Sequence, residues 1–217
     1  MTLECRRFGQ DCIGDNLRSM QSSNPPPAIG DLRQSLRAAT SEIHANLHLH
    51  AGFAAIQDGT IGLVAYRSLL VRLYGFHVAF EAAVGVSSDR SDWLQEDLTA
   101  LSVSRNTPLE KIPRCAALPA FDTPASRLGA LYVVEGSTLG GRQLARGLDQ
   151  LLGQAGNVGR RFFHGRGADT TPAWNAFLAR MTSSERTAAD HTETVEAAVK
   201  TFSIYEEWLS GWRHVTQ

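Results

Sequence analysis

Apolar residues recur every three or four positions along most of this chain, and no segment alternates apolar and polar residues as a half-buried strand would. On a helix predicted over about 31–49, one such stripe consists of Leu32, Leu36, Ala39, Ile43 and Leu47. The same spacing predicts further helices over about 61–84, 89–103, 123–152, 171–181 and 184–212. The sequence therefore predicts an all-α fold, a multi-helix bundle.

The beginning of the chain lacks this periodicity and ends in three consecutive prolines, Pro25, Pro26 and Pro27. Proline has no amide hydrogen to donate and restricts the residue before it, so this run cannot continue a helix. We expect residues 1–29 to form a flexible N-terminal extension. Residues 30–217 are then one domain, long enough to bury its own hydrophobic core.

The overall composition argues against several classes of protein. With 43% hydrophobic residues, 20% charged residues and a formal net charge of −1, the chain has an ordinary globular composition, and nothing in it argues for nucleic acid or an anionic membrane as a partner. No stretch reaches the roughly 20 apolar residues of a membrane span, and the N-terminus has no apolar core of a secretory signal. Three irregularly spaced cysteines, Cys5, Cys12 and Cys115, give no disulfide framework. We therefore expect a cytoplasmic protein with reduced thiols and with neither nucleic acid nor a membrane as partner.

Two histidines, His44 and His48, lie four residues apart and therefore on the same side of the first predicted helix. Neutral imidazole is a common protein ligand for haem iron, and a helix facing an apolar cavity can hold it rigidly. The alternative is that each is an ordinary, partly exposed polar residue beside the apolar stripe. A di-iron carboxylate centre is disfavoured, because none of the seven histidines follows a glutamate by three positions. For His77, in the stripe of the next helix, core packing is favoured over pocket lining.

Three glycines, Gly136, Gly140 and Gly141, interrupt the helical pattern predicted over about 123–152. Each glycine inside a helix costs roughly 0.5–1 kcal/mol relative to alanine, so a group of three suggests that the backbone is needed there. Glycine permits a kink and lets the backbone approach a flat ligand closely. A simple break between two helices, or a close helix–helix crossing, is the alternative interpretation.

Two segments of this sequence resemble the haem oxygenase family. Residues 36–44 read LRAATSEIH, which resembles the proximal helix of that family, where the final histidine is the axial iron ligand. Residues 131–141 read LYVVEGSTLGG, which resembles the distal helix of its bacterial branch, where the glycines lie over the haem. The resemblance covers about residues 31–212. It implies a haem sandwiched between a proximal helix and a kinked distal helix.

The resemblance also implies a role for individual residues. His44 would bind the iron, and the catalytic set would be completed on the distal side by Gly136, Ser137 and Gly140. Besides His44, Gly136 and Gly140, the residues expected to contact haem are Arg37, Thr40, Tyr132, Gly141 and Phe202.

Arg37 lies two helical turns before His44 and so shares its side of the helix, which suits a contact with a haem propionate. A solvated helix arginine remains the alternative for this residue. For Tyr132 and Phe202 the alternative is ordinary core packing.

The chain departs from the family pattern at two positions. Many relatives have a carboxylate four residues after the ligand histidine, where it accepts the imidazole N–H, and this chain has His48 there. Since such partners set the basicity of a ligand, the change bears on the electronic tuning of the iron. The animal enzymes place an aspartate in the distal segment where this chain has Ser137. A water network at Ser137 is our hypothesis for proton delivery.

The activity implied by the resemblance is oxidative cleavage of haem, which serves as both cofactor and substrate. Dioxygen and external electrons would convert it to biliverdin, carbon monoxide and ferrous iron. The expected partners are a ferredoxin or flavoprotein reductase as electron donor and a bacteriophytochrome as acceptor of biliverdin. The alternatives are a non-catalytic haem carrier or sensor on the same fold, and a different helical enzyme, such as a thiamine-degrading or metal oxidase relative.

Overall fold

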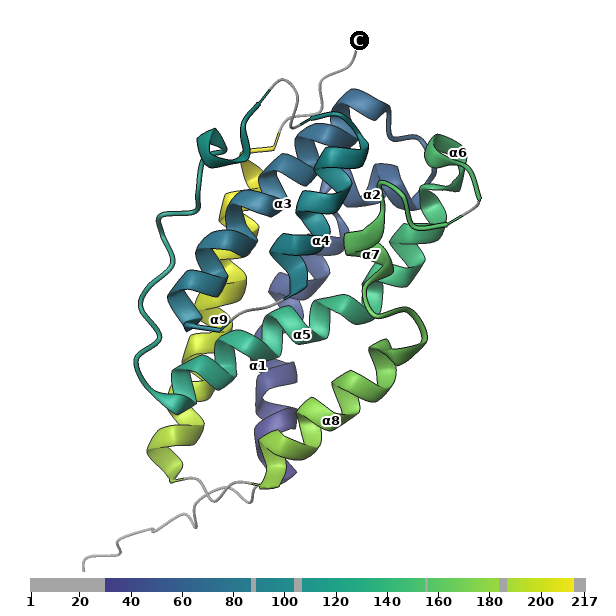
Figure 1. Ribbon diagram of the computed structural model, residues 1–217. Helices are drawn as coiled ribbons and strands as arrows, with labels where there is room; N and C mark the ends of the chain where they lie inside the picture. The colour runs from purple at the N-terminus through teal and green to yellow at the C-terminus, as the bar shows by residue number, and fades with distance from the viewer. Residues whose placement is uncertain (1–29, 87–88, 104–106, 155, 184–186, 213–217) are drawn as a thin grey trace, which may run out of the picture.

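The computed structural model describes residues 30–86, 89–103, 107–154, 156–183 and 187–212, and all regular structure in these ranges is helical (Figure 1). This confirms the all-α prediction. The extension predicted for residues 1–29 lies outside the described residues, as do Cys5 and Cys12, whereas Cys115 is buried and unbridged. None of the described helices combines the length and apolar character needed to cross a membrane.

The α-helices are α1 (Gly30–His48), α2 (Ala51–Gln57), α3 (Leu63–Val84), α4 (Asp89–Ala100), α5 (Pro124–Gly147), α6 (Asp149–Leu152), α7 (Arg161–His164), α8 (Thr170–Ser183) and α9 (Ala188–Ser210). Two 3₁₀ turns cover Leu109–Lys111 and Gly167–Asp169. The long periodic segments thus became helices close to their predicted bounds. The short helices α2 and α7 were not predicted, because fewer than two turns give no readable periodicity.

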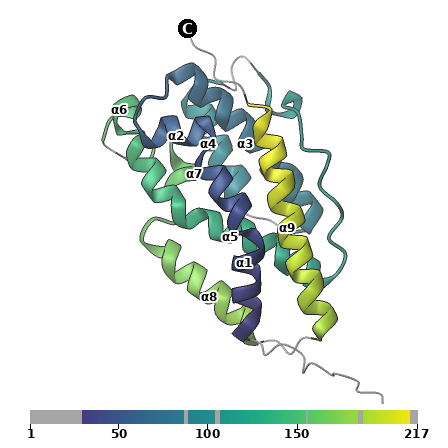
Figure 2. The same cartoon turned by 180° about the vertical axis from the view of Figure 1, so that it is seen from behind.

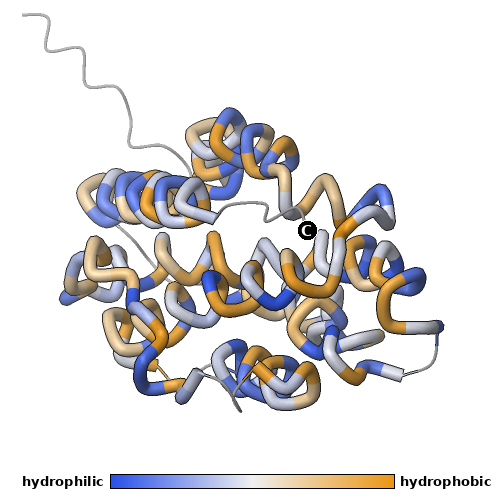
Figure 3. The backbone as a smooth tube through the Cα atoms, turned by 90° about the horizontal axis from the view of Figure 1, so that it is seen from above, coloured by the Kyte–Doolittle hydropathy of each residue, from blue (hydrophilic) through white to orange (hydrophobic). Residues whose placement is uncertain are grey.

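α5 crosses the middle of the molecule and packs most extensively on α9, which in turn packs on α1. Front and back views place α4 and α7 on one face of the molecule and α1 and α9 on the opposite face (Figures 1 and 2). Seen from above, hydrophobic and hydrophilic residues alternate along the helices, as in amphipathic helices of a bundle (Figure 3). α1 and α5 are thereby held in place through α9.

The simple break considered as the alternative within this segment does not occur, because α5 is continuous from Pro124 to Gly147 and bends along its path (Figures 1 and 2). Glycines in this helix permit close backbone crossings. A Cβ on Gly129 would lie 2.0 Å from the carbonyl oxygen of Thr194 on α9, and one on Gly147 would lie 2.1 Å from that of Ile56 on α2. Close packing of this kind explains why glycine occupies these two positions despite its helix-propensity cost.

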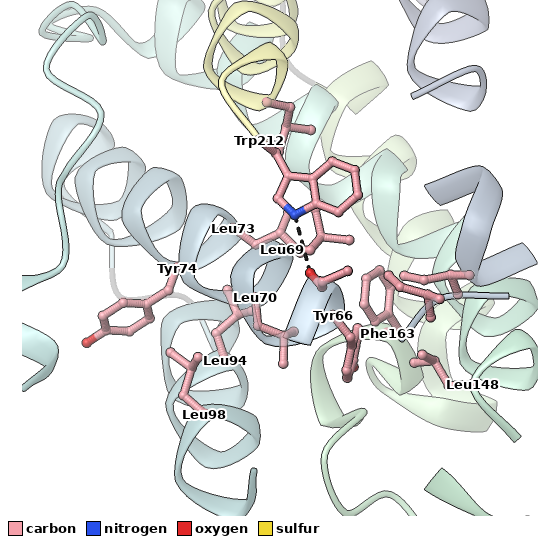
Figure 4. Packing of buried hydrophobic residues seen from close by; sticks show 14 of the residues in the cluster. Tyr66, Leu69, Leu70, Leu73, Tyr74, Leu94, Leu98, Leu148, Phe163 and Trp212 are labelled. Carbon is pink, nitrogen blue, oxygen red and sulfur yellow. Dashed lines mark hydrogen bonds between the residues drawn. The ribbon is translucent and has the colours of Figure 1, made fainter. Parts of the chain in front are cut away.

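The hydrophobic core has two parts that matter for the site. The larger one gathers leucines of α3 and α4 with Tyr66, Phe163 and Trp212, whose indole N–H donates to the Ala65 carbonyl at 3.3 Å (Figure 4). A second cluster joins α1, α5, α8 and α9 and includes Leu36, Val133, Trp174, Phe177 and Phe202. This second cluster fixes α1 relative to α5.

Candidate functional site

His44 lies on α1 beyond the two leucines, Leu32 and Leu36, that anchor this helix in the second core cluster. Its side chain is exposed, but its ring stacks on Phe202 of α9, with centroids 6.2 Å apart and planes 10° from parallel. Phe202 itself is buried. The structure therefore brings these two predicted site residues together and supports the orientation of the imidazole.

His48 lies beside His44, with ring centroids 4.6 Å apart in an edge-to-face arrangement. Partial burial lowers the pKa of His44, and the nearby charge of His48 lowers the same pKa further. The neutral form is therefore favoured at His44, and this is the form of imidazole that binds a metal.

Arg37 is exposed on α1 and lies close enough to Tyr132 of α5 to influence its ionisation. Burial raises the pKa of Tyr132, while the charges of Arg33 and Arg37 act in the opposite direction. Sequence reasoning missed Arg33, although its position four residues before Arg37 puts both on one side of the helix. Both guanidinium groups thus lie within electrostatic range of the phenol, and groups of this kind are suited to binding carboxylates.

Thr40 is placed differently from the other predicted contacts on α1. It is buried, and its hydroxyl donates to the carbonyl of Leu36 at 2.8 Å within the same helix. This bond accounts for the buried hydroxyl, so Thr40 supports the helix beneath His44 by packing.

The wall that α5 presents toward α8 is apolar and aromatic. The ring of Tyr132 packs against Trp174 of α8 at a centroid distance of 5.5 Å. A Cβ on Gly136 would meet Trp174 at 3.5 Å, which is ordinary contact. Gly136 therefore faces the same aromatic wall as Tyr132.

Gly140 and Gly141 are adjacent in sequence but have opposite surroundings. A Cβ on Gly140 would meet nothing within 4 Å, and this glycine is exposed. A Cβ on Gly141 would lie 2.6 Å from the carbonyl oxygen of Phe163 on α7, and this glycine is buried. Close packing on α7 by itself accounts for Gly141, which was expected to form part of the distal wall. Gly140 fits that expectation better.

Ser137 lies on an exposed part of α5, and its hydroxyl donates to the carbonyl of Val134 at 2.8 Å. The same carbonyl accepts a longer hydrogen bond, 3.4 Å, from the guanidinium of Arg90 on α4. Ser137 and a buried charged residue thus share one backbone acceptor. This link joins the proposed distal surface to the interior behind it.

A buried ion-pair network behind α5 was not foreseen from the sequence. Arg90 is 1% exposed, and its guanidinium lies 3.0 Å from the carboxylate of Glu135, which also pairs with Arg166 at 3.1 Å. Glu135 immediately precedes Gly136, so the network fixes α5 where the proposed distal segment begins. No local signal identifies it, because the three residues come from separate parts of the chain.

His77 of α3 lies in the core, as favoured from its place in the apolar stripe. It is 2% exposed, is surrounded by the rings of Phe76, Phe162 and Tyr205, and neither ring nitrogen has a hydrogen-bond partner among the described residues. Burial, reinforced by the charge of Arg90, lowers the pKa of His77 to about 3. This histidine is therefore neutral at physiological pH.

The residues around His44 fit a haem group. Among the described residues, no group of three or more His, Cys, Asp and Glu side chains could hold a metal ion. The porphyrin itself supplies four nitrogen ligands to the haem iron. The protein then needs to supply only one imidazole, such as that of His44. Arg33, Arg37 and Tyr132 can receive the porphyrin carboxylates, and the second core cluster supplies an apolar wall.

Comparisons with known proteins agree with this chemistry. The sequence model of the family described as heme oxygenase matches residues 30–211 of this chain. A protein of Xanthomonas campestris pv. campestris (strain 8004) named heme oxygenase is 28% identical over 169 residues, which cover 72% of this chain and 96% of that protein.

Solved structures resemble the fold. The heme oxygenase-1 of the cyanobacterium Synechocystis in complex with heme superposes with a TM-score of 0.66 at 18% identity, covering 83% of this chain and 91% of that one. The heme oxygenase of Leptospira interrogans gives a TM-score of 0.63 at 16% identity, covering 83% of this chain and 98% of that one. Both likenesses confirm the predicted fold.

Proposed function

Because the chain belongs to the haem oxygenase family, we propose that it cleaves haem with dioxygen and external electrons to biliverdin, carbon monoxide and ferrous iron. The observation that carries this proposal is the placement of His44. Its exposed imidazole has a lowered pKa, is stacked on Phe202, and lies on a helix that shares a core cluster with the glycine-bearing helix α5.

His44 would be the iron ligand, with its ring held in one plane by Phe202. When bound, haem supplies the iron that activates dioxygen and the porphyrin that is oxidised. Arg37, together with Arg33 and Tyr132, would bind the propionates through charge-assisted hydrogen bonds and so fix the rotation of the ring. Orientation of this kind decides which edge of the macrocycle meets the distal surface.

The distal surface would be formed by Gly136 and Gly140, which place no side chain over the ring. Because nothing lies within 4 Å of the position of a Gly140 Cβ, that glycine leaves room for a small ligand. Tyr132 and Trp174 would exclude bulk water from the apolar side of the pocket.

Ser137 would hold and pass protons at its Oγ, which already donates to the Val134 carbonyl. Behind it, Arg90 shares that carbonyl, and its charge acts on His77, whose two buried ring nitrogens have no hydrogen-bond partner among the described residues. Buried polar atoms such as these usually bind ordered water, which would extend the proton path. Since His77 stays neutral, it can both accept and donate a hydrogen bond there.

The partners belong to the same proposal. Electrons would come from a ferredoxin or a flavoprotein reductase, and a bacteriophytochrome would accept biliverdin. The chain would act in the cytoplasm.

Turnover of haem by the purified full chain tests the proposal. With haem, dioxygen, ferredoxin and its reductase, we expect the Soret band to disappear. Biliverdin, followed by its absorbance, and carbon monoxide should form in equimolar amounts. The matched control is His44→Ala under the same conditions, which should lose this conversion. A haem spectrum that persists with electrons supplied would contradict cleavage and favour a carrier or sensor.

A further inference from the structure

His44 and His48 form a pair of imidazoles on one exposed side of α1. Their ring centroids are 4.6 Å apart, and both side chains are open to solvent. Among the described residues, no hydrogen bond engages a ring nitrogen of either one. The function proposed above uses only one of these two rings.

We propose that His44 and His48 together form a binding site for a divalent transition-metal ion, such as Ni²⁺, Zn²⁺ or Cu²⁺, when haem is not bound. Histidines at positions i and i+4 of a helix can place one nitrogen each on a single ion, as they do in helical zinc sites. Water would complete the coordination, because the part of the chain that the structure describes offers no cluster with a third His, Cys, Asp or Glu.

Among the residues that the structure describes, the other histidines do not offer such a pair. His50 is occupied, because its Nδ1 accepts from the Gly52 amide at 3.2 Å and its Nε2 contacts the Leu209 carbonyl at 3.1 Å. His77 is buried among aromatic rings. His191 lies on α9 and has Val195 rather than a histidine one turn later.

Binding of one metal ion by both histidines requires only a rotation of the two imidazole rings. Imidazole ligands lie about 2.0–2.1 Å from zinc, so two of them on one ion have centroids within a few ångströms of the present spacing. The backbone is already fixed, because Leu36 and Leu47 of the same helix pack in the core. Such preorganisation favours chelation, since little conformational freedom is lost on binding.

If the metal ion and the haem iron both bind His44, they must compete for it. This consequence for haem binding rests on the proposed function. One imidazole nitrogen cannot bind the haem iron while it binds another metal ion. Saturating metal must therefore weaken haem binding, and haem must weaken metal binding by the same factor. Transition metals in excess would then inhibit this protein before any chemistry begins.

Calorimetric titration of the haem-free full chain with Ni²⁺ tests the site. We expect one site that weakens by at least about tenfold in both His44→Ala and His48→Ala, a loss that corresponds to about 1.4 kcal/mol. His191→Ala is the matched control and should bind as the wild type does. Circular dichroism of each variant shows whether the fold is retained. Unchanged Ni²⁺ binding in both folded variants would place the ion elsewhere and overturn the proposal.

A haem titration in saturating Ni²⁺ separates this inference from the proposed function. If the metal site and the proposed function are both correct, Ni²⁺ raises the apparent dissociation constant of haem in the wild type but not in His48→Ala. If Ni²⁺ binds at the pair and haem affinity does not change, the metal site stands and His44 is not the iron ligand. That second result would contradict the proposed function alone.

Discussion

The two sides of α5 differ in how they are built. The side toward α8 carries Tyr132 and Gly136, both next to the ring of Trp174. The side toward α4 and α7 carries Glu135, which is paired with a buried guanidinium, and Gly141, which is pressed on a carbonyl. The side toward α4 and α7, which we call the closed side, is fixed by charge pairs and tight backbone contacts. On the other, open side, Gly140 is exposed and has nothing within 4 Å of its Cβ position. A helix anchored on one side can be lined with glycine on the other without unfolding.

Removal of the Glu135 carboxylate from the ion-pair network should have the largest effect on the free energy of unfolding. Glu135→Leu takes away the carboxylate 3.0 Å from the guanidinium of Arg90, which is 1% exposed. A broken buried pair costs about 3–5 kcal/mol, and urea denaturation would measure the lost unfolding free energy. Asp89→Ala, which removes an exposed partner of Arg166, is the control and should cost about 1 kcal/mol or less. Equal losses in the two variants would show that the network does not anchor α5.

A larger side chain at Gly141, where α5 packs on α7, should cause the next largest loss of stability. Gly141→Ala places a Cβ 2.6 Å from the Phe163 carbonyl oxygen, and the neighbour is backbone, which cannot rotate away. Overpacking of this kind costs about 1–3 kcal/mol, and thermal unfolding of the haem-free chain would record it as a lower Tm. A Tm equal to or above that of the wild type would mean that α7 moves aside freely.

The buried histidine His77 should make the stability of the folded chain depend on pH. Burial and Arg90 lower the pKa of His77 from 6.5 to about 3, so between these values the unfolded chain binds a proton that the folded chain does not. Stability should therefore fall as the pH decreases below about 6.5, by up to about 1.4 kcal/mol per pH unit from this group. His77→Phe should lose that part of the slope in urea denaturation at pH 7, 6 and 5.

Asp97 provides the internal control for this experiment. Burial raises the pKa of Asp97 to about 7, although hydrogen bonds from the amides of Arg161 and Phe162 act in the opposite direction. Its contribution has the opposite sign, because stability from this group falls as the pH rises from about 4 to about 7. It is present in both proteins and cancels in the difference. Parallel slopes for wild type and His77→Phe would refute the assignment to His77.

The smallest effect on stability is expected on the open side. Gly140→Ala meets no atom within 4 Å and removes a helix-interior glycine, so the haem-free chain should gain up to about 1 kcal/mol. The same methyl group should weaken haem or dioxygen binding, because it would point toward the ligand. Thermal unfolding and a haem titration of one sample measure both effects. A variant that gains stability and also keeps full haem affinity and turnover would show that Gly140 does not face the ligand.

How far the sequence predicts this molecule depends on the range of the interactions. Helix α1 was predicted to within one residue at either end, since its periodic stripe is a local property. Helix α7 was missed, because it has four residues and is capped by Asp97, some sixty positions away. The sequence predicted the helical segment that became α5 but left a break at its glycines open as an alternative. The glycine contacts of α5 come from α9, α2 and α7, and no local rule describes them.

For the site, the pattern of residues and the family resemblance indicated His44 and Phe202, and the structure stacks them together. It also separates residues that sequence alone treats alike. Gly140 and Gly141 look equivalent in the sequence, yet only the second is closed off by α7. The network of Arg90, Glu135 and Arg166 depends on three distant segments and could be found only from their arrangement in space.

A haem titration followed in the Soret region tests the central claim most directly, which is that His44 binds the iron. The wild type and His48→Ala should both give the spectrum of a histidine-ligated haem. His44→Ala should lose it and regain it when free imidazole is added. A wild-type spectrum in His44→Ala, or a loss confined to His48→Ala, would contradict the claim.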